Sequence, residues 1–369
     1  MKRLSKIIFL ACPWGPRGGG MYKSADYLLQ AQAADSSAAA FYRPLDTRGG
    51  GSALASAAVL AAALLKLASA ALRGELAGVH VNMGERLSFF RKGILLTAAR
   101  AMGVPVVLHL HASQFDAFYR KLPRPVRAWA RWVFARATRV VVLGPWARRF
   151  VTEELHVPAN RVEAVTNGAP GLSAATEFAG LSKDTSRDAR LRLLFLGNLM
   201  ERKGVSDLFH ALALPGFDWE RLRVTLAGGG NLSFYQALAG RLGLSGRVEF
   251  LGWVGQDQAA ELLAAADVLV LPSHDEGLPL VILEALAQGV AVVCTPVGEI
   301  PFLLRDGEHV CFTPAGDAPA LAATLQRVLA DADLRENLRR NGQALYQACF
   351  TLDEFYGRIK RIHHQAFGI

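Results

Sequence analysis

The chain has 369 residues, 51% of them hydrophobic and 20% charged, with a formal net charge of +9. This length exceeds the size at which one hydrophobic core usually divides, so we expect two domains. The balance of apolar and charged residues excludes an intrinsically disordered chain. The four cysteines show no C-x-x-C or other metal-binding spacing, and they indicate reduced core thiols in a cytosolic protein.

The positive charge is concentrated in the first half of the chain. Residues 1–180 contain 23 Lys and Arg against 10 Asp and Glu, whereas residues 181–369 contain 18 against 22. The two halves therefore meet different partners, and the basic half fits nucleic acid or an anionic membrane. We expect no signal peptide, because the apolar run Ile7–Ala11 is short and leads into Pro13-Trp14-Gly15.

Short apolar runs alternate with helical patterns through the first half, as in a parallel sheet covered on both faces. The expected strands are Lys6–Cys12, Ala38–Tyr42, Val79–Asn82, Val104–Leu110, Arg139–Leu143 and Val162–Val165. The expected helices are Met21–Ala34, Ser52–Leu72, Leu87–Met102 and Phe115–Arg136. Ser52–Leu72 approaches the length of a bilayer span, but its many alanines and its place between two strands favour a crossover helix.

The alternation resumes after a polar segment, residues 168–190, that lacks apolar periodicity and resembles a linker. The expected strands are then Leu191–Leu196, Leu222–Ala227, Arg247–Leu251, Asp267–Leu271, Val290–Cys294 and His309–Phe312, with Pro301–Leu304 as a strand or turn. Helices fall between the strands and fill the C-terminal region to Phe367. The pattern predicts an α/β protein of two doubly wound domains with a site in the cleft between them.

The stretch Pro272–Gly289 combines a strand end, a polar loop and a helix that begins near Pro279. It places Glu276 beside the helix N-terminus and Glu284 about two turns into the helix. A strand end followed by a helix N-terminus is the usual ligand crevice of an open α/β sheet and favours an anion such as phosphate. The carboxylates cannot bind phosphate but can accept hydrogen bonds from sugar hydroxyls. A helix cap and a solvated helix face are the alternative interpretations of these two residues.

Two further loops follow strands. Gly18-Gly19-Gly20 allows a close backbone approach to a pyrophosphate or sugar, but its spacing is not that of a dinucleotide site. Arg202 and Lys203 follow Leu191–Leu196, where two cations beside a helix N-terminus suit a diphosphate. A tight turn and an ordinary surface loop remain the alternatives.

Two other groups stand out in the first half. His109 and His111 end a strand, and alternation places them on the same side. Residues 120–139 contain seven Lys and Arg, three large aromatics and no acid. That composition fits a helix on an anionic membrane, with a self-packed helix as the alternative. The membrane or acceptor residues predicted here are Arg124, Arg127, Trp129, Arg131 and Trp132.

Taken in order, these motifs resemble retaining glycosyltransferase family 4, which has the GT-B fold. Glu276 and Glu284 match the family's E-x7-E motif. Further matching segments are Gly197–Leu212, Gly228–Gly230, Phe250–Val254, His109–Ser113 and Asn167-Gly168. The resemblance implies Rossmann-like domains at residues 1–170 and 191–350, a linker at 171–190, and a C-terminal helix at 351–369 that packs back on the first domain.

The resemblance also implies roles for individual residues. Catalytic roles fall to His111 at the transferred sugar, Glu276 at the sugar hydroxyls and Lys203 at the diphosphate. Glu284 would bind the ribose, and the segment Phe250–Val254 would hold the base. The implied donor-binding set is Gly19, Gly20, Arg202, Gly229, Trp253, Val254, Gly277, Leu278, Pro279 and Glu284. One position departs from the family, because Asn198 stands where Arg is frequent; Arg202 is our hypothesis for the missing cation.

The implied reaction is transfer of a sugar from a UDP- or GDP-sugar with retention of configuration and without a metal or other cofactor. We expect a lipid-diphosphate-linked saccharide as acceptor, in bacterial cell-surface or exopolysaccharide biosynthesis. The protein would lie in the cytoplasm, at the inner face of the plasma membrane, and would bind no nucleic acid. A non-hydrolysing sugar-nucleotide epimerase of the same fold and a non-catalytic binding module are the alternatives.

Overall fold

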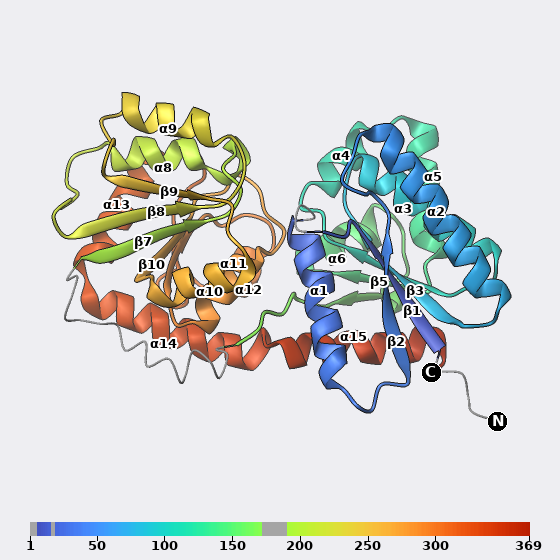
Figure 1. The fold of residues 1–369 in the computed structure, drawn as a ribbon. Coiled ribbons are helices and arrows are strands. Elements are labelled where there is room, and N and C mark those ends of the chain that lie inside the picture. The colour runs from blue at the N-terminus through green and yellow to red at the C-terminus, as the bar shows by residue number, and fades with distance from the viewer. Residues whose placement is uncertain (1–5, 16–18, 172–189) are drawn as a thin grey trace. The chain divides into compact units, whose positions relative to one another are not determined.

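The computed structural model describes residues 6–15, 19–171 and 190–369. The chain separates into two compact units, one formed by Met1–Gly168 with Leu352–Ile369 and the other by Ala169–Thr351 (Figure 1). The boundaries predicted at 170 and 351 lie within two residues of those of the first unit. Most of the linker predicted at 171–190 lies outside the described residues.

The first unit is built on a six-stranded sheet in which every pairing is parallel. Its spatial order is β2 (Ala40–Asp46), β1 (Lys6–Cys12), β3 (Leu76–Met83), β4 (Val106–Leu110), β5 (Arg139–Val142) and β6 (Val162–Ala164). The order reverses between β1 and β3. The carboxyl ends of these two strands therefore border the crevice where open α/β sheets bind ligands.

Reversal of the strand order puts helices on both faces of this sheet, because parallel crossovers keep one hand. One face carries α2 (Ala53–Leu72), α3 (Leu87–Ala101), α4 (Phe115–Lys121), α5 (Arg124–Arg136) and α6 (Pro145–Glu153). The other face carries α1 (Gly19–Ala34) and the C-terminal helix α15 (Leu352–Phe367). The helical segment expected over 115–136, with a break at Pro123 and Pro125, is two helices, since the chain is extended at Leu122 and Pro123.

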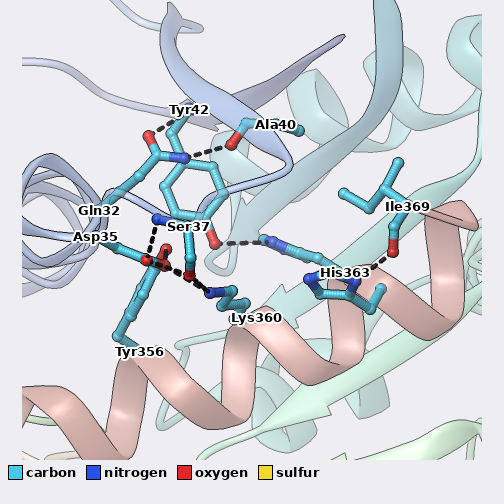
Figure 2. A network of polar contacts seen from close by, with 10 residues as sticks. Gln32, Asp35, Ser37, Ala40, Tyr42, Tyr356, Lys360, His363 and Ile369 are labelled. Carbon is cyan, nitrogen blue, oxygen red and sulfur yellow. Dashed lines mark hydrogen bonds and ion pairs between the residues drawn. The ribbon is translucent and has the colours of Figure 1, made fainter. Parts of the chain in front are cut away.

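The C-terminal helix α15 belongs to the first unit and lies against α1, β3 and β4. Phe367 packs directly on Gly78 of β3, where an added Cβ would lie 2.4 Å from the ring. Nearer the start of the helix, Lys360 Nζ and Tyr356 Oη bind Asp35 at 2.6 and 2.8 Å (Figure 2). The predicted return of the C-terminal helix to the first domain is confirmed.

The second unit has its own six-stranded parallel sheet. Its spatial order is β12 (Cys311–Phe312), β11 (Ala291–Cys294), β10 (Val268–Leu271), β7 (Leu191–Leu196), β8 (Leu222–Ala227) and β9 (Val248–Gly252). The order reverses between β10 and β7, so the loops after these strands border this unit's crevice.

The helices of the second unit cover both faces of that sheet. One group is η3 (Glu201–Lys203), α8 (Val205–Leu212), α9 (Leu232–Arg241) and α13 (Ala318–Ala330). The other is α10 (Gln256–Ala265), α11 (Leu280–Ala287) and α14 (Ala332–Cys349), with the short helix α12 (Ile300–Leu303). Pro301–Leu304 was expected as a strand or turn, but Pro301 instead occupies the first turn of α12, where a proline needs no N–H partner. All four cysteines are free, and three are buried, as predicted.

Candidate functional site

The crevice of the second unit brings the Lys203 and Glu276 motifs together. Lys203 ends η3 after β7, and Glu276 lies in the loop after β10. The Lys203 ammonium pairs with the Glu276 carboxylate, and both side chains are largely buried. Ser273 Oγ donates a second hydrogen bond to the same carboxylate oxygen at 2.8 Å. A buried charge requires such partners, so the pair is a built feature of the crevice.

Close backbone packing fixes the Glu276 loop from behind. Gly298 has φ +61°, and an added Cβ would lie 1.8 Å from the Glu276 carbonyl oxygen. The Glu299 N–H donates to the Gly277 carbonyl at 2.9 Å. The Glu276 side chain is therefore presented by a backbone that has little room to move.

Other contacts bind the two loops to each other. The His274 N–H donates to the Arg202 carbonyl at 2.9 Å, and the His274 ring contacts Asp207 at 2.6 Å. Arg202 Nη1 donates to the Asp275 carbonyl at 3.0 Å and lies 3.4 Å from its carboxylate. The guanidinium is 43% exposed. It thus lies in the crevice beside Lys203, and its role as a substitute cation stays a prediction.

The glycine turn after β8 packs against the loop after β7. Gly228 has φ +150°, and an added Cβ would lie 1.8 Å from the Gly197 carbonyl oxygen. Gly229 lies beside Trp253, whose indole is 62% exposed, while Val254 is half-buried. These residues form an open shelf at the carboxyl edge of the sheet. A groove of about 550 Å³ continues from it past Asn198 to Phe234.

The E-x7-E segment has the predicted layout. Helix α11 begins at Leu280 after Pro279, which is its N-cap, and the chain turns at Gly289 with φ +61°. Leu278 is buried, and Glu284 is 7% exposed in the second turn of α11. A solvated helix face is therefore excluded for Glu284, since its carboxylate is enclosed.

In the first unit, His111 lies at the carboxyl end of β4. Its Nε2 lies 2.7 Å from Asn82 Oδ1, and its ring lies against the His109 ring with centroids 3.9 Å apart. An amide oxygen only accepts, so Nε2 carries the proton and Nδ1 keeps a lone pair. Burial lowers the pKa of His111 to about 3, so the ring is neutral at physiological pH. The prediction that the two histidines share a side of the strand is confirmed.

Gly19 and Gly20 form the first turn of α1, two residues earlier than the predicted helix start. Gly19 has φ +65°, and a Cβ built at either glycine meets no described atom within 4 Å. Nearby, the fully buried Lys92 donates to Ser88 Oγ at 3.0 Å. Burial lowers the pKa of Lys92 to about 7, so this lysine is a core residue and not part of a basic surface.

Helix α5 differs from the sequence prediction at Trp129. Its indole is partly buried, because it packs over Gly93 and beside Phe89, with ring centroids 4.9 Å apart. Arg131 Nε is bound to Tyr119 Oη at 2.7 Å. Arg124, Arg131 and Trp132 are exposed and Arg127 is half-buried, and the Trp132 ring carries the Arg136 guanidinium. The helix is thus partly a self-packed element, which was the alternative interpretation.

The sequence reasoning missed two buried histidines, His80 of β3 and His363 of α15. His80 and Asn82 are two apart in an apolar strand, a spacing that places both on one face. The sequence therefore indicates that His80 and Asn82 share a face, but no local pattern links His80 to His363, 283 positions away.

The predicted residues thus form two groups. Lys203, Arg202, Glu276–Pro279, Glu284, Gly229, Trp253 and Val254 belong to the second unit, and His111, Gly19 and Gly20 to the first. Over residues 6–15, 19–171 and 190–369, no three His, Cys, Asp or Glu side chains are grouped to hold a metal ion.

Two parallel sheets, each with a crevice at its strand-order reversal, are the architecture of the GT-B fold. Residues 13–168 match the model "Glycosyl transferase 4-like domain", and residues 181–345 match "Glycosyl transferases group 1". The chain belongs to the glycosyltransferase family that these models describe, and the resemblance to family 4 is confirmed.

Relatives and solved structures agree with this assignment. The chain is 40% identical over 161 residues to the lipopolysaccharide core biosynthesis glycosyltransferase LpsE of Rhizobium meliloti, covering 43% of this chain and 45% of that protein. It is 27% identical to alpha-D-kanosaminyltransferase of Streptomyces kanamyceticus, over 72% of each chain. In fold it is similar to HepE of Anabaena, solved with UDP, at TM-score 0.73 and 19% identity over 98% of this chain and 100% of that one. It is also similar in fold to sucrose-phosphate synthase of Thermosynechococcus elongatus, at TM-score 0.78 and 20% identity over 98% of this chain and 99% of that one.

Proposed function

We propose that the protein transfers a hexose from a UDP- or GDP-sugar to a lipid-linked saccharide, with retention and without a metal. The observation that carries the donor assignment is the buried Lys203–Glu276 pair at the crevice of the second sheet. The pair places a cation that can bind a diphosphate directly beside a carboxylate that can bind sugar hydroxyls. Structures of HepE with UDP and UDP-glucose support a nucleotide-sugar donor.

The reaction requires stabilisation of charge on the departing diphosphate. Lys203, Arg202 and the N-terminal turn of α11 supply positive charge and N–H donors where that charge develops, and losing one such donor costs about a hundredfold or more in rate. Glu284 would bind the ribose, and the shelf at Gly229 and Trp253 would hold the base. His111 is neutral, so its Nδ1 can accept a hydrogen bond from a sugar hydroxyl.

Retention would arise from attack on the same face as the departing phosphate, which takes the acceptor proton. A double displacement needs a free carboxylate at the anomeric carbon. Glu276 is held by Lys203 and Ser273, which suits hydroxyl binding better than nucleophilic attack.

The acceptor side is assigned to the first unit because its sequence is basic and its helix α2 exposes apolar side chains. Helix α2 is long and apolar enough to cross a membrane, yet it packs on the sheet with 28% of Leu54–Leu72 buried. Leu54, Leu65 and Leu72 are 85, 73 and 89% exposed. We propose that α2, with the arginines of α5, rests on the inner face of an anionic membrane, as a step in cell-surface polysaccharide assembly requires. The name of the relative LpsE supports that setting.

The donor assignment is tested by thermal shift and hydrolysis with UDP-glucose, UDP-N-acetylglucosamine and GDP-mannose. We expect one of them to stabilise the protein and to be hydrolysed slowly without acceptor, and Lys203→Met to abolish both effects. If none of the three stabilises the wild type, or Lys203→Met responds as the wild type does, the assignment is wrong.

The acceptor assignment is tested by sedimentation with vesicles containing phosphatidylglycerol, and by activity on a lipid-linked acceptor. Failure of the vesicles to retain the protein, together with unchanged activity of Arg127→Ala and Arg131→Ala, would exclude the membrane setting.

A further inference from the structure

A row of buried side chains crosses the first unit from α15 to His111. Tyr42 Oη lies 3.0 Å from His363 Nδ1, and His363 Nε2 lies 2.8 Å from His80 Nδ1. His80 Nε2 then lies 3.3 Å from His109 Nδ1, and the His109 ring lies against His111. Figure 2 shows the outer end, where the Tyr42 hydroxyl meets the His363 ring. We name Tyr42, His363, His80 and His109 the imidazole row.

Every ring of the row is neutral at physiological pH. His80 and His109 are fully buried and His363 is 1% exposed. Burial lowers the pKa of all three, that of His80 to about 3. Burial also raises the pKa of Tyr42, which keeps its hydroxyl proton. A neutral imidazole has one N–H donor and one acceptor nitrogen, so each ring must donate to one neighbour and accept from the other.

Only two arrangements of protons satisfy the row. In the first, Tyr42 donates to His363, and each ring donates from Nε2 to the Nδ1 of the next. In the second, every bond is reversed, and the Tyr42 hydroxyl proton loses its partner. His109 Nε2 has no partner among the described residues in either case. Each arrangement leaves one buried donor unpaired, the His109 Nε2–H in the first and the Tyr42 hydroxyl in the second. The row therefore requires one common tautomer, with the proton on Nε2 in all three histidines or on Nδ1 in all three.

The row ends at the residue to which the proposed function gives a role at the sugar. His109 fills the space beside His111, and Asn82 fixes His111 from the β3 side. Rotation of the His109 ring would break its hydrogen bond to His80, so the row fixes the orientation of the His109 ring. That ring in turn limits the positions open to the His111 ring packed against it. Because cores are close-packed, a loss at His80 is expected to reach His111 through His109.

We propose that His80 and His363 are positioning residues that fix the ring of His111 through His109. The C-terminal helix thereby supports the candidate active site as well as the stability of the first unit. This inference rests on the proposed function for the role of His111, but the order of the row does not. Positioning errors of about 1 Å cost a transferase about ten- to a hundredfold in rate.

The first test determines the tautomer and protonation state of each histidine in the row, by 15N NMR of the full-length protein labelled at histidine. We expect His363, His80 and His109 to share one tautomer, Nε2–H in all three or Nδ1–H in all three, and their shifts not to change between pH 5.5 and 8. In His80→Leu, the ring signals of His109 and His111 should both move. A protonated ring or a mixture of tautomers among the three rings in the wild type, or an unmoved His111 signal in His80→Leu, would overturn the inference.

The second test separates positioning from stability. His80→Leu should lower kcat ten- to a hundredfold, with little change in donor KM, on the sugar nucleotide that the wild type hydrolyses. His80→Gln, which keeps one donor and one acceptor in place, should recover most of the rate. Phe355→Leu is the matched control, because Phe355 is buried on α15, the helix that carries His363, but lies outside the row.

The outcomes distinguish this inference from the proposed function. If His80→Leu keeps the wild-type kcat, or Phe355→Leu loses as much rate at equal thermal stability, His80 is not a positioning residue. If the wild type turns over no sugar nucleotide, the proposed function fails, and the NMR test still decides whether His80 fixes the His111 ring.

Discussion

The ammonium of Lys203 and the carboxylate of Glu276 neutralise each other in a largely enclosed crevice. A diphosphate that binds Lys203 has to displace Glu276 or share the lysine with it. A sugar that binds Glu276 likewise has to displace Lys203 or share the carboxylate with it. A diphosphate reaching Lys203 also meets the negative charge of Glu276, while a sugar hydroxyl reaching Glu276 finds one of its two oxygens engaged by both Lys203 and Ser273. We therefore expect binding of the nucleotide and binding of the sugar to be coupled through this pair.

Glu276→Gln is expected to separate the two functions of the pair. Removing the carboxylate charge frees Lys203, so UDP or GDP should bind about fivefold more tightly, equivalent to a Coulomb energy of about 1 kcal/mol. Turnover of the sugar nucleotide should fall about a hundredfold or more, because the amide holds the sugar hydroxyls less strongly. Calorimetry of the free nucleotide and steady-state kinetics measure the two effects.

The control for this prediction is Lys203→Met, which should weaken both UDP binding and turnover. Parallel behaviour of the two variants, with nucleotide affinity lost in each, would show that Glu276 contacts the nucleotide and not the sugar.

The strands and the crevice residues were predictable because their signals are local. Apolar runs bounded by glycine and proline marked the sheets, and the eight-residue interval from Glu276 to Glu284 marked the loop and helix. Alternation also placed His109 and His111 together. In each case, residues a few positions apart determine the geometry.

The rest depends on contacts between distant parts of the chain. No local pattern brings His363 to His80 or Lys360 to Asp35. Composition misplaced Trp129, because an aromatic on a basic helix looks the same whether it faces lipid or the space above Gly93. The burial of Lys92 has the same origin, because it depends on packing that its own helix does not reveal.

Gly298→Ala tests whether the Glu276 loop depends on its backing. A Cβ at Gly298 would clash with the Glu276 carbonyl oxygen, in addition to the cost of about 1–2 kcal/mol for a left-handed residue with a side chain. We expect a loss of more than about 2 kcal/mol in the free energy of unfolding, or a shifted loop with weaker donor binding. Chemical denaturation and nucleotide titration measure both.

Gly307→Ala is the matched control, since Gly307 has φ +70° but no atom within 4 Å of an added Cβ. Gly307→Ala should lose only the cost of a left-handed residue with a side chain, about 1–2 kcal/mol, and should bind the donor normally. Equal effects of the two substitutions would mean that the contact with Glu276 is unimportant.

The imidazole row predicts acid sensitivity of the fold. The pKa of His80 is about 3 when folded and near 6.5 when unfolded, so the unfolded chain binds more protons between these values. The stability contributed by neutral burial is complete above pH 6.5 and is lost as the pH falls. His80 alone should lose about 1.4 kcal/mol between pH 7.5 and 5.5, and His109 and His363 act in the same direction.

Urea denaturation at pH 7.5 and 5.5 measures this loss. The free energy of unfolding of His80→Gln should change less between the two pH values than that of the wild type, because one fewer histidine takes up a proton on unfolding. An unchanged difference would mean that His80 is already protonated, or free to be, in the folded protein.

Leu65→Asp on α2 tests the proposed membrane surface. Leu65 is 73% exposed on the apolar face of a helix that contains no acidic residue. A charge there should cost little folding stability, but it places a carboxylate against the interface and repels anionic lipid. We expect retention on phosphatidylglycerol vesicles to fall about tenfold, while hydrolysis of a soluble sugar nucleotide is unchanged. Leu214→Asp, at an exposed leucine of the second unit, should retain wild-type binding. If Leu65→Asp sediments with vesicles as the wild type does, while Arg127→Ala does not, the arginines of α5 and not the apolar face of α2 form the contact.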